Sequence, residues 1–268
     1  MTSPEIAATT HNVRTDGYGT IPVALSERGE GRPFLLLHGG GGPLTVAGFA
    51  DLLAAERPAR VITPTHPGFA GTPRPDALTS ISGLAAVYAA LLAELGITGV
   101  TVVGNSIGGW IAAEIALLDT TRISRLVLID AVGIEVPGHP VVDFFSLTPR
   151  QVAELSYHDP DRFGIDPTKM PAEAQKAMAG NRATLAVYAG TSMGAAGLAA
   201  RLAKVTTPTL VLWGDSDRIA DADYGRAYAE AIPGARFQVL SKTGHLPQIE
   251  TPGQLLDAIW AFADGNAE

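Results

Sequence analysis

The 268-residue sequence predicts an α/β protein, with a mostly parallel central sheet flanked by helices and a helical cap insertion. Three observations lead to this fold class. Short apolar runs rich in β-branched residues alternate with helical patterns over most of the chain. A Gly-x-Ser-x-Gly segment at residues 104–108 joins one such run to a helix. The apolar runs that predict strands stop after residue 133 and resume after residue 204.

The first half of the chain supplies the start of this sheet. Residues 10–28 alternate loosely around glycine and proline, which predicts two short antiparallel strands at an edge. The apolar run 33–37 predicts a strand covered on both faces. The elements expected next are a helix over 46–56, a strand over 60–63, a structural loop over 66–73, an amphipathic helix over 83–96 that stops at Gly96, a strand over 100–103, a helix over 106–119 and a strand over 126–130.

The second half begins with the insertion. Six prolines between residues 137 and 171 separate short segments, of which 149–155 and 171–188 have helical patterns. We expect a helical cap over residues 134–204 and a core built from residues 1–133 and 205–268. The core elements expected after the cap are a strand over 209–213, a helix over 221–232, a strand over 236–240 and a helix over 252–264.

Composition limits the partners and the compartment. Hydrophobic residues make up 46% of the chain, enough for a large core, and a net charge of −8 without any basic run disfavours nucleic acid. The absence of cysteine excludes disulfides and thiolate chemistry. Residues 1–14 lack a signal-peptide pattern, and the longest apolar stretch, Ile107 to Leu118, is interrupted by Glu114. We expect a cytoplasmic protein with no membrane partner, no cofactor and no metal; its oligomeric state is open, with a homodimer as one option.

Ser106 is the candidate nucleophile. The run Val100 to Val103 leads directly into Gly104-Asn105-Ser106-Ile107-Gly108, and the residues after it recur at helical spacing. A serine at the tip of such a turn has an unfavourable backbone conformation, and glycines two residues away on either side avoid collisions with the strand and the helix. Its hydroxyl is thereby presented at the carboxyl edge of the sheet. The alternative is a glycine-rich connection that holds an incidental serine.

A glycine run, residues 39–42, comes directly after His38 at the end of the first buried strand. Four glycines let the backbone approach a ligand closely and direct its N–H groups toward either a phosphate or an oxyanion. The phosphate alternative lacks both Gly-x-x-x-x-Gly-Lys and Gly-x-Gly-x-x-Gly in register. With Ser106 as the nucleophile, we interpret the run as an oxyanion-binding loop that His38 fixes by hydrogen bonding.

A serine hydroxyl needs a base, and the base needs an orienting carboxylate. Among the six histidines, His245 follows the last strand on a loop at the carboxyl edge, where it could face Ser106. Asp217 is the preferred acid, because it follows the preceding strand and fits the chain order Ser, Asp, His. Asp215, which could instead brace the turn, and Asp130, at the end of an earlier strand, are the alternatives.

Together these segments resemble the α/β-hydrolase superfamily. The resemblance covers most of residues 10–265 and rests on Gly104-Asn105-Ser106-Ile107-Gly108-Gly109, Trp213-Gly214-x-x-Asp217, Gly244-His245 and His38-Gly39-Gly40. Within the superfamily the chain is similar to carboxylesterases and to the carbon–carbon hydrolases of meta-cleavage (ring-fission) products. The resemblance implies an α/β-hydrolase fold, an oxyanion hole made by the N–H groups of Gly40 and Ile107, and a cap that supplies the acyl or leaving-group pocket.

The sequence indicates less clearly which residues would contact the substrate. By the same resemblance, Arg182 could play the part of the arginine that carbon–carbon hydrolases use on the substrate carboxylate, or it is a solvated helix residue; Asn105 and Gly39 are further candidate substrate-binding residues. The chain departs from those hydrolases at Leu246-Pro247, where they have an aromatic residue, and at Phe49-Ala50, where they have an asparagine. A serine in place of an aspartate nucleophile separates it from the dehalogenase and epoxide-hydrolase branches.

The sequence thus predicts a serine hydrolase of a small acyl substrate, most simply a carboxylic ester. Ser106, His245 and Asp217 would form and hydrolyse an acyl-enzyme. Two alternatives stay open. One is carbon–carbon bond hydrolysis of a vinylogous diketone, and the other is a non-catalytic hydrolase-fold protein that binds a small molecule under the cap.

Overall fold

The computed structural model describes residues 8–118 and 121–265, and within these ranges eight strands form one sheet in the order β1-β2-β4-β3-β5-β6-β7-β8. The strands are β1 Thr9–Thr15, β2 Gly19–Arg28, β3 Arg32–Leu37, β4 Ala59–Thr65, β5 Val100–Asn105, β6 Ile123–Ile129, β7 Thr209–Gly214 and β8 Arg236–Leu240. β2 pairs antiparallel with β1 and β4, and the other neighbouring strands are parallel. The expected mostly parallel sheet is confirmed.

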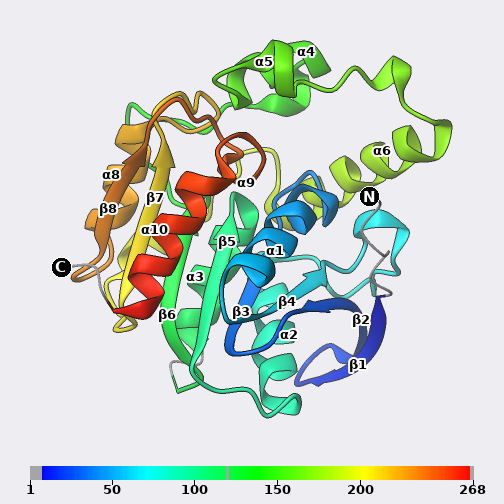
Figure 1. Ribbon diagram of the computed structural model, residues 1–268. Helices are drawn as coiled ribbons and strands as arrows, with labels where there is room; N and C mark the ends of the chain where they lie inside the picture. Colours follow the sequence, from blue (N-terminus) through cyan, green and yellow to red (C-terminus); the bar gives the residue numbers. More distant parts are fainter. Residues whose placement is uncertain (1–7, 119–120, 266–268) are drawn as a thin grey trace.

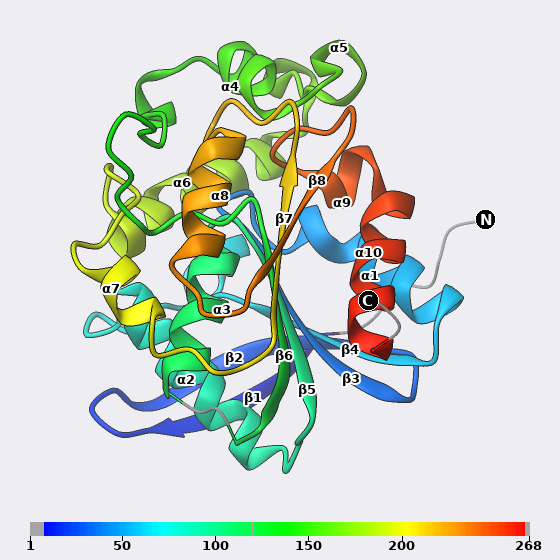
Figure 2. The same ribbon diagram turned by 90° about the vertical axis from the view of Figure 1, so that its left-hand side faces the viewer.

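Helices cover both faces of this sheet (Figure 1, Figure 2). Neighbouring strand residues point to opposite faces, so Phe34 packs with α1 (Leu44–Glu56) and α10 (Pro252–Asp264). Leu35 belongs to the core on the other face, which includes α2 (Ile81–Glu94), α3 (Ile107–Leu118) and α8 (Ala222–Glu230). No helix in the described ranges combines the length and the hydropathy that a membrane span requires.

Local signals account for most element boundaries. The hydroxyl of Ser80 accepts a hydrogen bond from the N–H of Gly83 at the start of α2, and Gly96 follows its end with a φ of +64°. Helix α3 begins at Ile107, one residue later than expected, and residue 119 of the predicted helix lies outside the described residues. Strand β6 begins three residues before the predicted start. Polar Ser124 and Arg125 interrupt its apolar run, but the pairing with β5 continues across a register shift that passes over Ser124.

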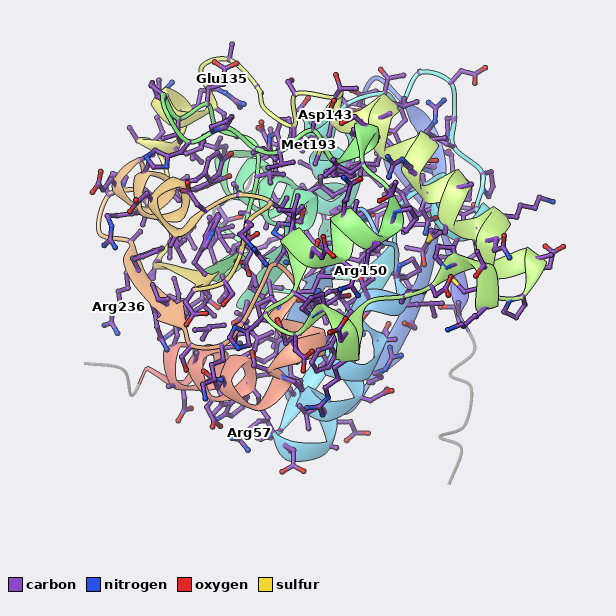
Figure 3. All side chains as sticks on the ribbon, turned by 90° about the horizontal axis from the view of Figure 1, so that it is seen from above. Arg57, Glu135, Asp143, Arg150, Met193 and Arg236 are labelled. Carbon is purple, nitrogen blue, oxygen red and sulfur yellow. The ribbon has the colours of Figure 1, made fainter. Side chains whose placement is uncertain are left out.

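The chain between β6 and β7 holds the predicted cap segment, residues 134–204. Its helices are η2 Phe144–Ser146, α4 Pro149–Ser156, α5 Pro160–Phe163, η3 Pro167–Lys169, α6 Ala172–Ala189 and α7 Leu198–Leu202. In Figure 1, α4 and α5 lie above the sheet, whereas Figure 2 shows α7 low beside α3, which it contacts. Figure 3 looks down on this side of the molecule, with Arg150 of α4 near the middle of the view. The division into core and cap stays a prediction.

Candidate active site

Ser106 occupies the sharp turn between β5 and α3. Its φ of +57° lies in the left-handed region that residues other than glycine rarely adopt. The turn is held by the Ser106 N–H, which donates to the Ile129 carbonyl (2.9 Å), and by the Ser106 carbonyl, which accepts from the Gly109 N–H (3.0 Å). The serine is 8% exposed.

The two glycines of the motif make this turn sterically feasible. A Cβ on Gly104 would lie 2.1 Å from the carbonyl oxygen of Gly108, and a Cβ on Gly108 would lie 2.3 Å from that of Leu37. Both contacts are with backbone atoms, which cannot move aside as a flexible side chain would. The spacing of the motif therefore follows from the close approach of α3 to β5 and β3.

His245 is paired with Asp217. Its Nδ1 lies 2.7 Å from Oδ2 of Asp217, and both side chains are buried. The other carboxylate oxygen accepts from the N–H groups of Ile219 (2.8 Å) and Ala220 (3.3 Å). Because an ionised carboxylate only accepts hydrogen bonds, Nδ1 carries the ring proton, which leaves Nε2 as the basic nitrogen.

The two alternative acids have different surroundings. Asp215 is exposed, and its carboxylate accepts from the N–H groups of Lys242 (2.9 Å) and Thr243 (3.2 Å), so it braces the turn before His245. Asp130 is fully buried at the end of β6, and its Oδ1 accepts from the Gly214 N–H (2.8 Å). Of the three aspartates, Asp217 makes the hydrogen bond to His245.

The glycine run passes close to the nucleophile. A Cβ on Gly39 would lie 3.2 Å from Cβ of Ser106, and a Cβ on Gly40 would lie 2.5 Å from Leu185 of α6. Within the described residues, the N–H groups of Gly40 and Ile107 are not used by any acceptor of the protein. These are the two groups that the resemblance assigns to an oxyanion hole, and they are available to an anion in the site.

His38 and His66 form a buried pair behind this loop, with ring centres 3.7 Å apart. The His66 backbone N–H donates to Nε2 of His38 (3.1 Å), which leaves the His38 proton on Nδ1, 2.7 Å from the Gly39 carbonyl. Nε2 of His66 lies 2.8 Å from the His38 carbonyl, and its Nδ1 accepts from Tyr88 (2.6 Å). Burial lowers the pKa of His38 to about 4 and that of His66 well below its usual value.

Asn105 is used within the protein. Its amide nitrogen donates to the carbonyl oxygens of His245 (2.9 Å) and Ile129 (3.3 Å), and its oxygen accepts from Gln248 (3.1 Å). These bonds connect β5, the strand before Ser106, to the chain that carries His245 between β8 and α9, residues 241–246, which we call the histidine loop. They give Asn105 a positioning role, and they add buried Gln248, which the sequence analysis missed. Asn105 also lines the cavity beside Ser106, and its contact with substrate stays a prediction.

Asn181 was also missed. This buried residue of α6 donates from Nδ2 to the Gly41 carbonyl (3.0 Å) and accepts at Oδ1 from the Ala70 N–H (2.7 Å). On the next turns of α6, the Tyr188 hydroxyl donates to the Pro67 carbonyl (2.9 Å). Helix α6 is therefore bonded to the glycine run and to the loop after β4. An asparagine on the apolar side of a predicted helix was the signal that could have found it.

The end of α4 is bonded to the histidine loop in the same way. The N–H of His245 donates to the Ser156 carbonyl (2.7 Å). The carboxylate of Glu250, on α9 (Pro247–Glu250), accepts from the N–H groups of His158 (3.1 Å) and Gly244 (2.7 Å). The end of α4 is thus joined to the loop that carries His245 by one backbone hydrogen bond and through the side chain of Glu250.

A cavity of about 460 Å³ lies between these elements and is lined by Ser106, His245 and the glycines 39–41. Arg182 also lines it and is half-buried; its Nη2 donates to the Phe144 carbonyl (2.9 Å), and its guanidinium lies 5.2 Å from the ring centre of Phe145. Most other lining side chains are apolar, among them Leu147, Val152, Ile165, Leu185 and Ile219. The cavity therefore presents a serine hydroxyl, an imidazole and a guanidinium in mostly apolar surroundings.

The chain is similar in sequence to known hydrolases. The chain is 30% identical over 264 residues to a 2-hydroxymuconate semialdehyde hydrolase of Pseudomonas putida, covering 92% of this chain and 90% of that protein. It is 28% identical over 262 residues to a 2-hydroxy-6-oxo-2,4-heptadienoate hydrolase of Pseudomonas putida strain F1, covering 87% and 89%.

Solved structures and the family profile point the same way. A thermophilic esterase from Thermogutta terrifontis superposes with a TM-score of 0.76 at 25% identity, covering 97% of this chain and 98% of that one. The meta-cleavage product hydrolase CumD of Pseudomonas fluorescens IP01 shares the fold, with a TM-score of 0.72 at 20% identity, covering 97% and 98%. Residues 34–258 match the profile of the alpha/beta hydrolase family. The chain therefore belongs to the alpha/beta hydrolase family and is a hydrolase.

Proposed function

We propose that the chain is a serine hydrolase that cleaves a small acyl substrate through an acyl-enzyme. The observation that carries this proposal is the Asp217–His245 pair, held at 2.7 Å beside the cavity that Ser106 also lines. His245 takes the Ser106 proton through Nε2 as the oxygen attacks the carbonyl carbon, and returns it to the leaving group. Asp217 holds the imidazole in the required tautomer and stabilises the imidazolium.

The N–H groups of Gly40 and Ile107 stabilise the oxyanion of each tetrahedral intermediate. One such donor is typically worth about 3–4 kcal/mol of transition-state stabilisation. Water, activated by the same histidine, then releases the acid and regenerates Ser106. The requirements on the substrate are a carbonyl carbon within reach of Ser106 and a body that fits about 460 Å³ of mostly apolar space. A small carboxylic ester meets both requirements, and we place it first.

Carbon–carbon hydrolysis of a vinylogous diketone is the second candidate. Arg182 supports it, because this cation lines a largely apolar cavity and keeps further N–H donors for a carboxylate. The curated relatives with 30% and 28% identity are named as hydrolases of a hydroxymuconate semialdehyde and of an oxo-heptadienoate. Such a substrate carries a carboxylate, whereas a neutral ester does not need Arg182.

Covalent labelling tests the proposal most directly. A fluorophosphonate probe should label wild-type protein on Ser106, and Ser106→Ala should lose both the label and the hydrolysis of nitrophenyl esters while keeping its melting temperature. Labelling at another residue, or turnover by Ser106→Ala near the wild-type rate, would refute the assignment. Absence of label and of turnover on every substrate would instead support a binding protein. Comparing kcat/KM for nitrophenyl esters and for a dienoate separates the two reactions.

A further inference from the structure

A second buried carboxyl group, that of Asp130, lies beside the Asp217–His245 pair. Asp130 directly follows β6. The neighbouring strand in the sheet is β7, which leads to Asp217. One carboxylate oxygen of each aspartate and one ring nitrogen of His245 lie within 4.8 Å of one another. Asp130 is 0% exposed and Asp217 4% exposed, so bulk solvent screens their interaction little. The mechanism above gives Asp130 no task.

The hydrogen bonds distinguish the two carboxyl groups. Asp217 accepts from three donors: the imidazole of His245 and the N–H groups of Ile219 and Ala220. Asp130 accepts from one, the Gly214 N–H on Oδ1, and within the described residues its buried Oδ2 receives no hydrogen bond. An anion belongs where donors converge. An oxygen without a donor, beside a carboxylate, is instead the place for a proton.

Both groups cannot be ionised together at this distance without a large cost, since two buried like charges disfavour each other. Burial, and after it the charge of Asp217, raise the pKa of Asp130 well above its usual range, and a hydrogen bond between the two side chains acts in the same direction. The charged or titratable groups that face Asp130 are Asp217 and His245.

We propose that Asp130 is a positioning residue, held as the neutral acid, which donates the proton on Oδ2 to the carboxylate of Asp217. This inference rests on the proposed triad. The donated hydrogen bond gives the orphaned oxygen its partner and fixes the carboxylate of Asp217 in the orientation that meets Nδ1 of His245. The proton stays on Asp130 throughout the reaction, so His245 faces one negative charge and not two.

Substitution by asparagine provides a direct test. Asparagine has the shape of the neutral acid, tolerates the φ of +44° at this position, and can both donate to Asp217 and accept from Gly214. Asp130→Asn should therefore keep kcat within about threefold of wild type, and Asp130→Gly, which suits the backbone but has no donor, should lose about tenfold or more. If Asp130→Asn is as damaging as Asp217→Asn, Asp130 is an anion that serves His245 directly and the proposal fails.

The pH profile gives a readout that a purely structural role would not change. The acid limb of kcat/KM reports the protonation of His245. Replacing a neutral acid by a neutral amide should leave this limb nearly unmoved in Asp130→Asn. Had Asp130 been ionised, its replacement would remove a negative charge near the imidazole and move the limb to lower pH. A shift of about one pH unit in that direction would contradict the proposal.

Thermal unfolding tests whether Asp130 is protonated in the native protein, and it requires no measurement of enzyme activity. In the unfolded chain Asp130 ionises near its ordinary pKa of 3.8, whereas in the native protein it stays protonated, so native wild type loses stability relative to the unfolded chain as pH rises above that value. The melting temperature of Asp130→Asn minus that of wild type should therefore increase steadily from about pH 4 to pH 7. Asp257→Asn, which removes an exposed carboxylate paired with Arg57, is the matched control and should give a nearly flat difference. A flat or falling difference for Asp130→Asn overturns the inference. Because this measurement needs no turnover, it separates failure of the inference from failure of the proposed function, which Ser106→Ala decides.

Discussion

Acidification should destabilise this protein through the buried pair His38 and His66. Both are neutral when folded, with the pKa of His38 near 4 and that of His66 well below its usual value because of burial. In the unfolded chain each takes up a proton as pH falls through about 6.5. The unfolded state therefore binds more protons between pH 6.5 and 4, and the free energy of unfolding falls as pH falls through that window.

The size of the effect follows from the difference between the pKa of a histidine in the unfolded chain and its pKa in the folded protein. At about 1.4 kcal/mol per pH unit, His38 alone accounts for about 2 kcal/mol lost by pH 5, and the lowered pKa of His66 acts in the same direction. The loss from His38 alone is already a sizeable part of the 5–15 kcal/mol typical of a folded domain.

Urea unfolding at pH 7, 6 and 5 measures this loss. His38→Asn should be less stable than wild type at pH 7 but should lose about 2 kcal/mol less between pH 7 and 5, because the variant has no proton to take up at this position. His158→Asn removes an exposed histidine and should lose stability with pH as wild type does. If wild type and His38→Asn show parallel losses, His38 is not held neutral and the reasoning about this pair is wrong.

Three further predictions concern catalysis. Asp217→Asn should lower kcat by about 10⁴-fold in steady-state assays, as the corresponding change does in a serine protease. Asp215→Asn should lower kcat by less than about tenfold, because Asp215 only braces the turn. The reverse order of these two effects would reassign the acid. Arg182→Met should lower kcat/KM for anionic substrates by about 10-fold to 150-fold, because it removes a charge-assisted hydrogen bond worth about 1.5–3 kcal/mol. It should barely change kcat/KM for neutral esters, and equal effects on both substrate types would remove the main support for carbon–carbon cleavage. Asn181→Ala should lower kcat as well as the melting temperature, since it releases the glycine run from α6; a lower melting temperature with unchanged kcat would limit Asn181 to stability.

The parts of the fold that the sequence predicted are those with local causes. Gly104, Ser106 and Gly108 form a turn whose steric requirements lie within five residues, and Gly96 ends a helix through its own backbone conformation. The alternation of strands and helices is likewise written in short apolar runs. These signals needed no knowledge of distant contacts.

The parts that the sequence did not predict depend on partners far apart in the chain. The pairing of His38 with His66 joins residues 28 positions apart, and no periodicity indicates which of two histidines will meet. Asp217 was preferred to Asp215 as the acid, but periodicity could not supply that choice, since both follow the same strand and the fold of one loop decides which of them meets His245. Asn105 is a further example, because its amide donates to the carbonyl oxygen of His245, 140 positions away, and nothing in the sequence indicated that partner.

The separate attachment of α4 and α6 has a consequence for how molecules reach the cavity. The end of α4 is bonded to the histidine loop, and α6 is bonded to the glycine run, so neither can swing outward without disturbing the chemistry beneath it. The stretch between them, residues 164–171, makes its hydrogen bonds only with partners between residues 160 and 175 among those described, and its Ile165 is 58% exposed. We therefore expect substrate to be admitted past this stretch. Shortening, lengthening or exchanging it should change which acyl chains are accepted, and at what rate, while the reacting groups stay where they are.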